Sequence, residues 1–263
     1  MVDTGLAVVT GASSGIGREL AHLLAADGYD LVIAADDAAL DDAAADLARH
    51  GTEVRPVRVD LREPGSVWDV YDAAGAGGRA VDVAALNAGT GRAGRFVDDR
   101  LDADLRIVDV NVRSTVALAK LLLRDMARRD AGRVLVTSSL VAMMPGSYQS
   151  MYNASKAFLQ SFTEALHDEF RGTGVTVTAL LPGATDTEFF RRVGMLDTPL
   201  ARLPVKDDPA HVAKQGYDAL LRGDAKVVAS SPISKATGAV ARVLPDSVKA
   251  VANRLLVTPF GSR

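Results

Sequence analysis

Short apolar runs of strand length alternate along this chain with segments whose apolar residues recur at helical spacing, and this alternation is what most constrains the fold. Each run is nearly continuous, which is typical of a strand covered on both faces of a sheet. The alternation predicts right-handed βαβ crossovers and a single-domain α/β fold, a doubly wound (Rossmann) parallel sheet with helices on both faces. Six strands are expected at residues 6–9, 31–35, 54–59, 83–86, 134–137 and 175–181. Five helices are expected at residues 16–26, 37–49, 66–74, 103–129 and 152–171.

The pattern loosens after Pro182. Residues 188–206 are interrupted by glycine and proline, which predicts a mobile segment over a substrate pocket. A helix at 209–221 and a short strand near Val227 are expected to follow, and they complete a predicted domain over residues 1–230.

Residues 231–263 are expected to form a C-terminal helical extension. Apolar residues in it recur at near-helical spacing, with Lys249 and Arg254 between them. This pattern predicts one or two helices packed on the body of the protein or on a neighbouring subunit. Contact with a membrane surface is the weaker alternative, because a basic amphipathic helix can lie on lipid.

The charge balance excludes one class of function and limits the kinds of site. There are 30 Lys and Arg against 33 Asp and Glu, a formal net charge of −3, and no long basic run, so a binder of nucleic-acid phosphates is not expected. The absence of cysteine excludes disulfides and thiolate metal sites, and the four scattered histidines predict no metal centre. No basic region precedes the first apolar residues, and no apolar run reaches about 18 residues, so a soluble cytoplasmic protein is expected.

A glycine-rich segment, TGASSGIG, lies between the first expected strand and the first expected helix. Its glycines allow a tight turn and a close approach of the backbone to a pyrophosphate, and the helix N-terminus offers free N–H groups. An ordinary glycine-rich turn is the alternative, but the strand-turn-helix context favours a nucleotide site. The candidate cofactor-binding residues here are Thr10, Gly11, Ser13, Ser14, Gly15, Ile16 and Gly17.

Three motifs together resemble the short-chain dehydrogenase/reductase family. They are the glycine-rich segment, Asn87-Ala88-Gly89 after the fourth expected strand, and Tyr152-x-x-x-Lys156 preceded by Ser139. The match follows the family's order and spacing over about residues 6–187. The roles given in the next paragraphs are those that the resemblance implies.

The resemblance implies a catalytic set of Ser139, Tyr152, Lys156 and Asn111. Tyr152 and Lys156, four residues apart, share one face of a helix, and a positive charge beside the phenol favours the phenolate. Tyr152 would be the acid/base, while Ser139, preferred to Ser138 because it lies 13 residues before Tyr152, would orient the substrate oxygen. The backbone carbonyl of Asn111 would hold a water linked to Lys156.

Further cofactor-binding residues follow from the same resemblance. Asn87, Ala88 and Gly89 would pack beside the adenosine ribose, and Asp60 with Leu61 would lie near the adenine, although an Asp there could equally cap a helix. The residues expected near the nicotinamide amide are Pro182, Gly183, Thr185 and Thr187, in a Pro-Gly segment that is elsewhere usually a simple turn.

The choice of nicotinamide cofactor depends on the end of the second strand. NADP users typically have an Arg where this chain has Asp36, and often a basic residue where it has Ser14. A carboxylate accepts hydrogen bonds from ribose hydroxyls and repels a 2′-phosphate, so NAD is favoured over NADP. If NADP is used, a basic group elsewhere must hold the phosphate, and Arg18 is one candidate.

The expected function is therefore an NAD(P)-dependent oxidoreductase that transfers a hydride between nicotinamide and a carbonyl or secondary alcohol. A non-catalytic nucleotide-binding sensor or scaffold on the same fold is the alternative.

The substrate is expected to be a hydrophobic alcohol or ketone, with Arg191 and Arg192 as candidates for binding an acidic one. A homotetramer or homodimer is expected through the helices near 105–128 and 152–170. The residues expected to line the substrate pocket are Leu140, Met143, Met144, Gln149 and the segment 189–200.

Overall fold

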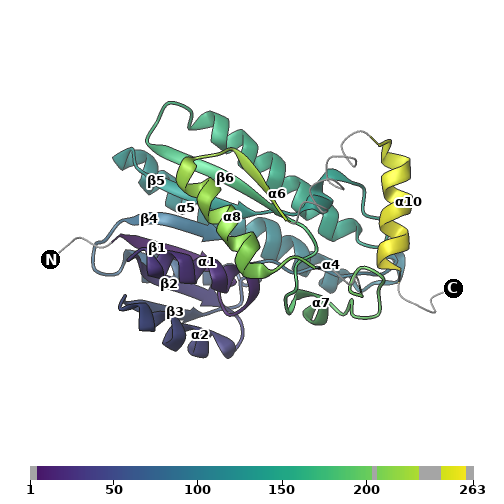
Figure 1. Cartoon of the computed structure of the whole chain (residues 1–263), viewed down its shortest axis with the longest axis horizontal. Helices are drawn as coiled ribbons and strands as arrows, with labels where there is room; N and C mark the ends of the chain where they lie inside the picture. Colours follow the sequence, from purple (N-terminus) through teal and green to yellow (C-terminus); the bar gives the residue numbers. More distant parts are fainter. Residues whose placement is uncertain (1–4, 203–205, 231–243, 259–263) are drawn as a thin grey trace.

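The computed structural model describes residues 5–202, 206–230 and 244–258 of the chain. Seven parallel strands form one sheet with the order β3-β2-β1-β4-β5-β6-β7, which crosses the molecule in Figure 1. The predicted doubly wound parallel sheet is therefore confirmed. The strands are β1 Leu6–Thr10, β2 Asp30–Ala35, β3 Val54–Arg58, β4 Val81–Leu86, β5 Gly132–Thr137, β6 Val175–Pro182 and β7 Lys226–Ala229.

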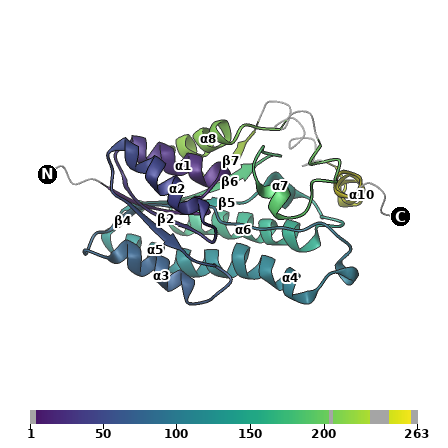
Figure 2. The ribbon, with the colours of Figure 1, turned by 90° about the horizontal axis from the view of Figure 1, so that it is seen from below.

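Helices cover both faces of the sheet, as Figure 2 shows. One apolar core joins α1, α2 and α8 to the upper face in that view, and a second joins α3, α5 and α6 to the lower face. Both cores consist mainly of aliphatic side chains, such as Ile33 and Leu135 in the first and Val8 and Val136 in the second. The helices that the argument uses are α1 Gly15–Ala26, α2 Ala39–Leu47, α3 Ser66–Gly75, α4 Leu101–Ile107, α5 Ser114–Arg129, α6 Ser150–Glu169, α7 Phe189–Arg192, α8 Pro209–Arg222 and α10 Asp246–Val257.

The strand order reverses between β1 and β4. β1 pairs with β2 on one side and with β4 on the other, so the chain winds outward in both directions from this point. In open α/β sheets, ligands bind beyond the carboxyl ends of the strands at such a switch point. The fold therefore places its main binding crevice at the end of the sheet where β1, β4 and β5 terminate.

Two local predictions differ from the structure. The helix expected at 103–129 is divided by a π-helical segment, Val108–Arg113, between α4 and α5. The strand expected to be covered on both faces at 54–59 is instead the edge strand β3, and none of its five residues is fully buried. Pro56 is tolerated there because an edge strand needs hydrogen-bond donors on one side only.

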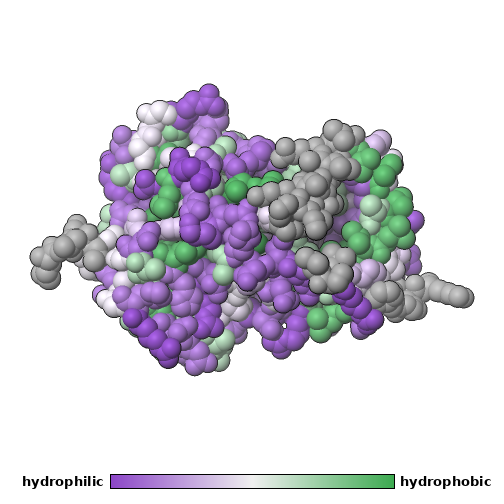
Figure 3. All heavy atoms as spheres, viewed as in Figure 1, coloured by the Kyte–Doolittle hydropathy of each residue, from purple (hydrophilic) through white to green (hydrophobic). Residues whose placement is uncertain are grey.

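The predicted extension lies partly outside the described residues, because 231–243 are not described. Its remaining part contains α10, which packs on the body of the protein: Asn253 Nδ2 donates to the Ser147 carbonyl over 2.9 Å, and the Leu256 carbonyl accepts from the Leu200 N–H over 2.8 Å. The outer side of α10 leaves Leu255 exposed and forms part of the apolar patch over this helix in Figure 3. Within the described residues, no helix combines the length and apolar character needed to cross a bilayer.

Candidate active site

A cavity of about 1090 Å³ opens beyond the carboxyl ends of the strands. It runs from the glycine-rich loop and the ends of β2 and β3 to α6, α7 and α10. Most of the residues predicted from the sequence line it: Gly11, Ser14, Gly15, Ile16, Asp36, Asp60, Leu61, Asn87, Ala88, Gly89, Ser139, Tyr152, Lys156, Pro182, Gly183, Thr185 and Thr187. Four predicted residues lie behind this wall and act on it through contacts: Thr10, Ser13, Gly17 and Asn111.

Two glycines of the segment that joins β1 to α1 have no room for a side chain. A Cβ on Gly17 would lie 2.1 Å from the carbonyl oxygen of Gly11, and a Cβ on Gly15 would lie 2.9 Å from Thr187 Cγ2, at a positive φ of 56°. Ser14, the residue before α1, makes no side-chain capping hydrogen bond to the helix. The first-turn N–H groups of α1 are thus left uncapped by that side chain, which fits a pyrophosphate at this helix N-terminus.

Hydrogen bonds from Thr10 fix the segment after β4. Thr10 Oγ1 accepts from the N–H groups of Asn87 and Ala88, over 3.0 and 3.1 Å. The Asn87 carboxamide oxygen accepts from Thr137 Oγ1 over 3.0 Å, so β1, β4 and β5 are joined at their ends. Asn87 and Thr10 therefore shape the floor of the cavity.

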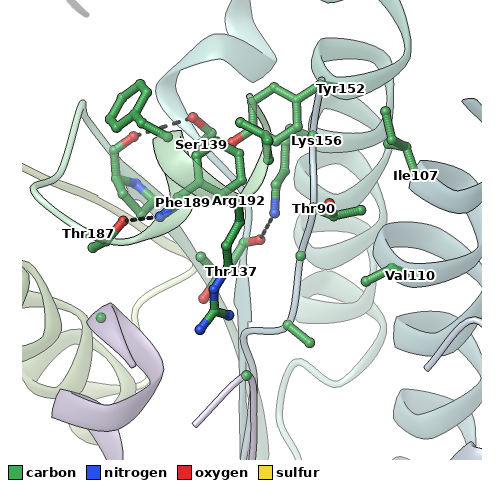
Figure 4. A pocket seen from close by; sticks show the side chains of 18 of the residues that line it. Thr90, Ile107, Val110, Thr137, Ser139, Tyr152, Lys156, Thr187, Phe189 and Arg192 are labelled. Atoms are coloured by element: carbon green, nitrogen blue, oxygen red, sulfur yellow. Dashed lines mark hydrogen bonds between the residues drawn. The ribbon is translucent and has the colours of Figure 1, made fainter. Parts of the chain in front are cut away.

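Tyr152 and Lys156 project from one face of α6 into the cavity, opposite Ser139 at the end of β5 (Figure 4). Lys156 Nζ lies 5.9 Å from the centre of the Tyr152 ring and donates a 2.9 Å hydrogen bond to the carbonyl of Thr137. Ser139 Oγ accepts from the N–H of Val141 over 3.3 Å. A hydroxyl, a phenol and an ammonium thus meet at one end of the cavity.

Burial determines the protonation of this cluster. It raises the pKa of Tyr152 to about 12, although the hydrogen bond with Ser139 acts to lower it. It also lowers the pKa of Lys156 to about 8. Desolvation thus outweighs the hydrogen bond and opposes the expected shift of the phenol towards neutral pH.

Asn111 lies in the π-helical segment and is completely buried. Its Nδ2 donates to the Thr90 carbonyl and to Ser155 Oγ, each over 2.9 Å, and its Oδ1 accepts from the Thr90 N–H over 2.8 Å. The side chain thereby ties α6 to the segment after β4. π-helical turns are frequent at functional sites, where they displace one residue from the regular helical pattern.

The acidic residues that line the cavity near the ends of β2 and β3 have basic neighbours. Asp60 accepts a 2.6 Å hydrogen bond from Arg62 Nε and a 2.9 Å hydrogen bond from the backbone N–H of Arg62. The hydrogen bond from the Arg62 side chain lowers the pKa of Asp60. Asp36 Oδ2 lies 4.0 Å from Arg106 Nη2 on α4. Arg18, by contrast, pairs with Asp46 over 2.7 Å and does not line the cavity.

Mainly apolar side chains line the cavity near α6, α7 and α10. The predicted Leu140, Met144 and Gln149 line it, whereas Met143 does not. Other lining residues come from residues 188–202, the segment over the cavity, and from α10: Phe189, Phe190, Val193, Met195, Leu200, Asn253 and Leu256.

The two arginines of α7 have different surroundings. Arg191 pairs with Glu188 and is largely exposed, so it does not face the cavity. Arg192 lines the cavity, and its guanidinium reaches Asp37 and the glycine-rich loop.

Sequence reasoning missed several cavity residues. Thr90, Asp37 and Val110 each adjoin a predicted site residue, so those predictions could have been extended to include them. The others carry no local signal, because the packing of distant segments brings them to the cavity: Arg92, Arg106, Ile107 and Thr137.

Comparison with known proteins gives a consistent result. The sequence model of a family described as short chain dehydrogenase matches residues 5–195. An uncharacterized oxidoreductase of Myxococcus xanthus is 33% identical over 254 residues, which cover 95% of this chain and 96% of the relative. Some curated relatives are longer, and the match covers only 60% of one and 32% of another.

Two solved structures are similar over nearly the whole chain. A short-chain dehydrogenase from Sphingobium yanoikuyae in complex with NADPH has a TM-score of 0.81 and 25% identity, covering 98% of this chain and 99% of its own. A short chain dehydrogenase/reductase from Burkholderia phymatum in complex with NAD has a TM-score of 0.80 and 25% identity, covering 90% and 92%.

Proposed function

The chain belongs to the short-chain dehydrogenase/reductase family, and from this premise we propose that it transfers a hydride between a nicotinamide dinucleotide and the carbonyl or secondary alcohol carbon of a hydrophobic small molecule. The observation that carries the proposal is the convergence of Ser139, Tyr152 and Lys156 on the cavity that the glycine-rich loop also lines. A bound nicotinamide supplies the hydride acceptor or donor of this reaction.

In the proposed reaction, the chain's own groups handle the proton and the substrate oxygen. Tyr152 donates its phenolic proton to the carbonyl oxygen during reduction and takes the alcohol proton during oxidation. Ser139 donates a hydrogen bond to the same oxygen and orients it. The Lys156 ammonium stabilises the phenolate, and Asn111 supports the proton relay that reaches Lys156.

The residues present fit a dinucleotide. The close-packed glycines and the uncapped N-terminus of α1 suit a pyrophosphate, while Asp60 and Asp36 line the adenosine end. We propose that NAD is preferred to NADP, because the half-exposed Asp36 carboxylate would repel a 2′-phosphate. Similar proteins have been solved with NADPH and with NAD, so both cofactors belong in the test.

The substrate end supports a hydrophobic ligand. Phe189 stands over Tyr152, with ring centres 5.5 Å apart, and Met144 and Leu256 line the wall around them. Such side chains bind apolar surface, and they offer few fixed charges. We therefore propose bulky ketones and secondary alcohols as substrates.

We also propose a homo-oligomer that uses the helices on the α4–α6 side of the sheet. Leu101, Leu105 and Phe158 on these helices are exposed apolar side chains, which support a contact surface. Light scattering of the purified chain would give the mass. A monomer at micromolar concentration would contradict this part of the proposal.

The function is tested by binding followed by turnover. Titration with NADH and NADPH, followed by nicotinamide fluorescence, should give saturable binding, with NADH at least about tenfold tighter. A panel of bulky ketones should then give oxidation of the bound nucleotide. Tyr152→Phe should keep the binding and lose most of the turnover. Near-normal turnover in that variant would refute the acid/base role, and binding without turnover of any substrate would favour the non-catalytic alternative.

A further inference from the structure

Arg192 joins the segment over the cavity to the glycine-rich loop, although these regions lie 178 residues apart in the sequence. One nitrogen of its guanidinium, Nη2, lies 2.6 Å from Asp37 Oδ2 and 3.2 Å from Ser14 Oγ. All three residues line the cavity, and Figure 4 shows the Arg192 side chain directed into it. A strong cation is thus held at the end of the cavity that the sequence assigns to the cofactor.

The groups around this guanidinium are those that bind an anion. The Asp37 carboxylate occupies the place of that anion. Ser14 precedes α1, so the guanidinium lies beside a helix N-terminus, where the N–H groups and the helix dipole also favour negative charge. Asp37 supplies that negative charge, and its Oδ2 also accepts from Ser13 Oγ over 3.0 Å. Its other oxygen, Oδ1, is buried without a hydrogen-bond partner in the described part of the chain.

A phosphate would satisfy this site better than Asp37 does. Guanidinium groups donate paired N–H bonds to phosphate oxygens, and a phosphate carries more acceptors and more charge than a carboxylate. Ser14 Oγ and the uncapped first turn of α1 add donors on the same side. The acidic neighbour Asp36 is itself 4.0 Å from Arg106, so its charge is partly offset.

We propose that Arg192 is a phosphate-binding residue of the dinucleotide site, and that its guanidinium exchanges the Asp37 carboxylate for a phosphate of the cofactor when the cofactor binds. The inference rests on the proposed function. The phosphate is either the pyrophosphate, which both cofactors carry, or the 2′-phosphate, which only NADP carries. If it holds the 2′-phosphate, Arg192 takes the role for which the sequence suggested Arg18, which pairs with Asp46 and does not line the cavity.

The exchange would link the cofactor to the substrate pocket. The turn that carries Arg192, α7, also carries Phe189 against Tyr152 and the buried Phe190. A phosphate held by Arg192 therefore fixes the same turn that stands over the acid/base. Cofactor binding is expected to precede and favour substrate binding.

The first test compares Arg192→Gln with Arg191→Gln. Both remove one arginine charge from the same turn, but Arg191 pairs with Glu188 outside the cavity. The dissociation constants, measured by nicotinamide fluorescence, should rise at least about tenfold in Arg192→Gln, either for both NADH and NADPH or for NADPH alone, and stay within about twofold in Arg191→Gln. Equal weakening of both cofactors identifies the pyrophosphate, and weakening of NADPH alone identifies the 2′-phosphate. Binding of both as tight as in Arg191→Gln would overturn the proposal.

The second test separates phosphate binding from a merely structural tie. Asp37→Asn removes the competing carboxylate but keeps an oxygen and an NH₂ group at the same place, so cofactor binding should tighten by at least about threefold, while Arg192→Gln weakens it. If the pair only ties the segment to the loop, breaking it from either side would weaken binding in both variants, and that result would overturn the proposal. Thermal melting of each variant checks that it is folded. A wild-type chain that bound neither cofactor would instead contradict the proposed function.

Discussion

The Lys156 ammonium donates a 2.9 Å hydrogen bond to the carbonyl of Thr137, the last residue of β5. Lys156 is 96% buried, with only 4% of its surface exposed, and this burial lowers its pKa from 10.5 to about 8. The end of β5 therefore fixes the position of an ammonium group whose proton is bound less tightly in the folded chain than in the unfolded chain. At neutral pH the ammonium is present beside Tyr152, and it is lost as the pH rises through 8.

Replacing Lys156 by Met should change how stability depends on pH. Between pH 8 and 10.5 the unfolded chain binds a proton that the folded chain has released, so this group makes the wild-type chain more stable as the pH rises through that window. Lys156→Met removes the titration. The unfolding free energy of the wild type should therefore rise relative to that of the variant by about 3 kcal/mol across the window, measured by urea unfolding at a series of pH values.

Lys120→Met is the control for this experiment, because it removes an exposed lysine from α5. The difference between Lys120→Met and the wild type should not follow the same course. A Lys156→Met variant whose stability stays parallel to the wild type from pH 7 to 10.5 would show that burial does not perturb this lysine.

The sequence predicted those parts of the site that short segments determine. Tyr152 and Lys156 share a helix face because they are one turn apart. The glycine pattern of the first loop is itself enough to predict a close-packed turn. The doubly wound parallel sheet followed from the alternation of elements, since right-handed crossovers leave few other topologies.

The remaining parts depend on contacts between distant segments. No local pattern places Arg192 against Ser14, because the segment over the cavity has no regular periodicity. The π-helical turn at Asn111 was read as ordinary helix, since an inserted residue leaves little trace in hydrophobic spacing. The pKa of Tyr152 was expected to fall, because the sequence shows the neighbouring lysine but not the desolvation that outweighs it.

Gly17→Ala should damage the glycine-rich loop. The added Cβ would lie 2.1 Å from the Gly11 carbonyl oxygen and 2.5 Å from Asn87 Nδ2, so backbone must move. We expect a loss of about 3 kcal/mol in unfolding free energy, measured by urea unfolding, together with weaker dinucleotide binding. Gly75→Ala is the matched control at the end of α3, where a Cβ meets no atom within 4 Å; that variant should be unchanged or gain up to about 1 kcal/mol.

Asn111→Leu should destabilise the chain more than its volume suggests. Leucine has a similar size, but it leaves the Thr90 N–H and carbonyl without the Asn111 side chain that pairs with both. It also removes the N–H that Ser155 Oγ accepts, although that hydroxyl still donates to the Tyr152 carbonyl. We expect a loss of more than about 3 kcal/mol by urea unfolding, because each unsatisfied buried group costs about 1–3 kcal/mol. Ser155→Ala removes only one of the three bonds from Asn111, and a loss as large as that of Asn111→Leu would contradict this account.

Asp36→Arg should shift the cofactor preference towards NADP. The Asp36 side chain is half exposed at the cavity wall, with Arg106 4.0 Å away, so an arginine there would join an existing cation without needing to be buried. Two positive charges beside the ribose favour a 2′-phosphate, and the loss of the carboxylate removes an acceptor for the ribose hydroxyls. The ratio of the NADH and NADPH dissociation constants should shift at least about tenfold towards NADPH, or 1.4 kcal/mol, by fluorescence titration.

Asp41→Arg makes the same charge change on α2 outside the cavity and should leave the ratio unaltered. A ratio that moved equally in both variants would mean that overall charge, rather than the position of Asp36, governs the choice of cofactor.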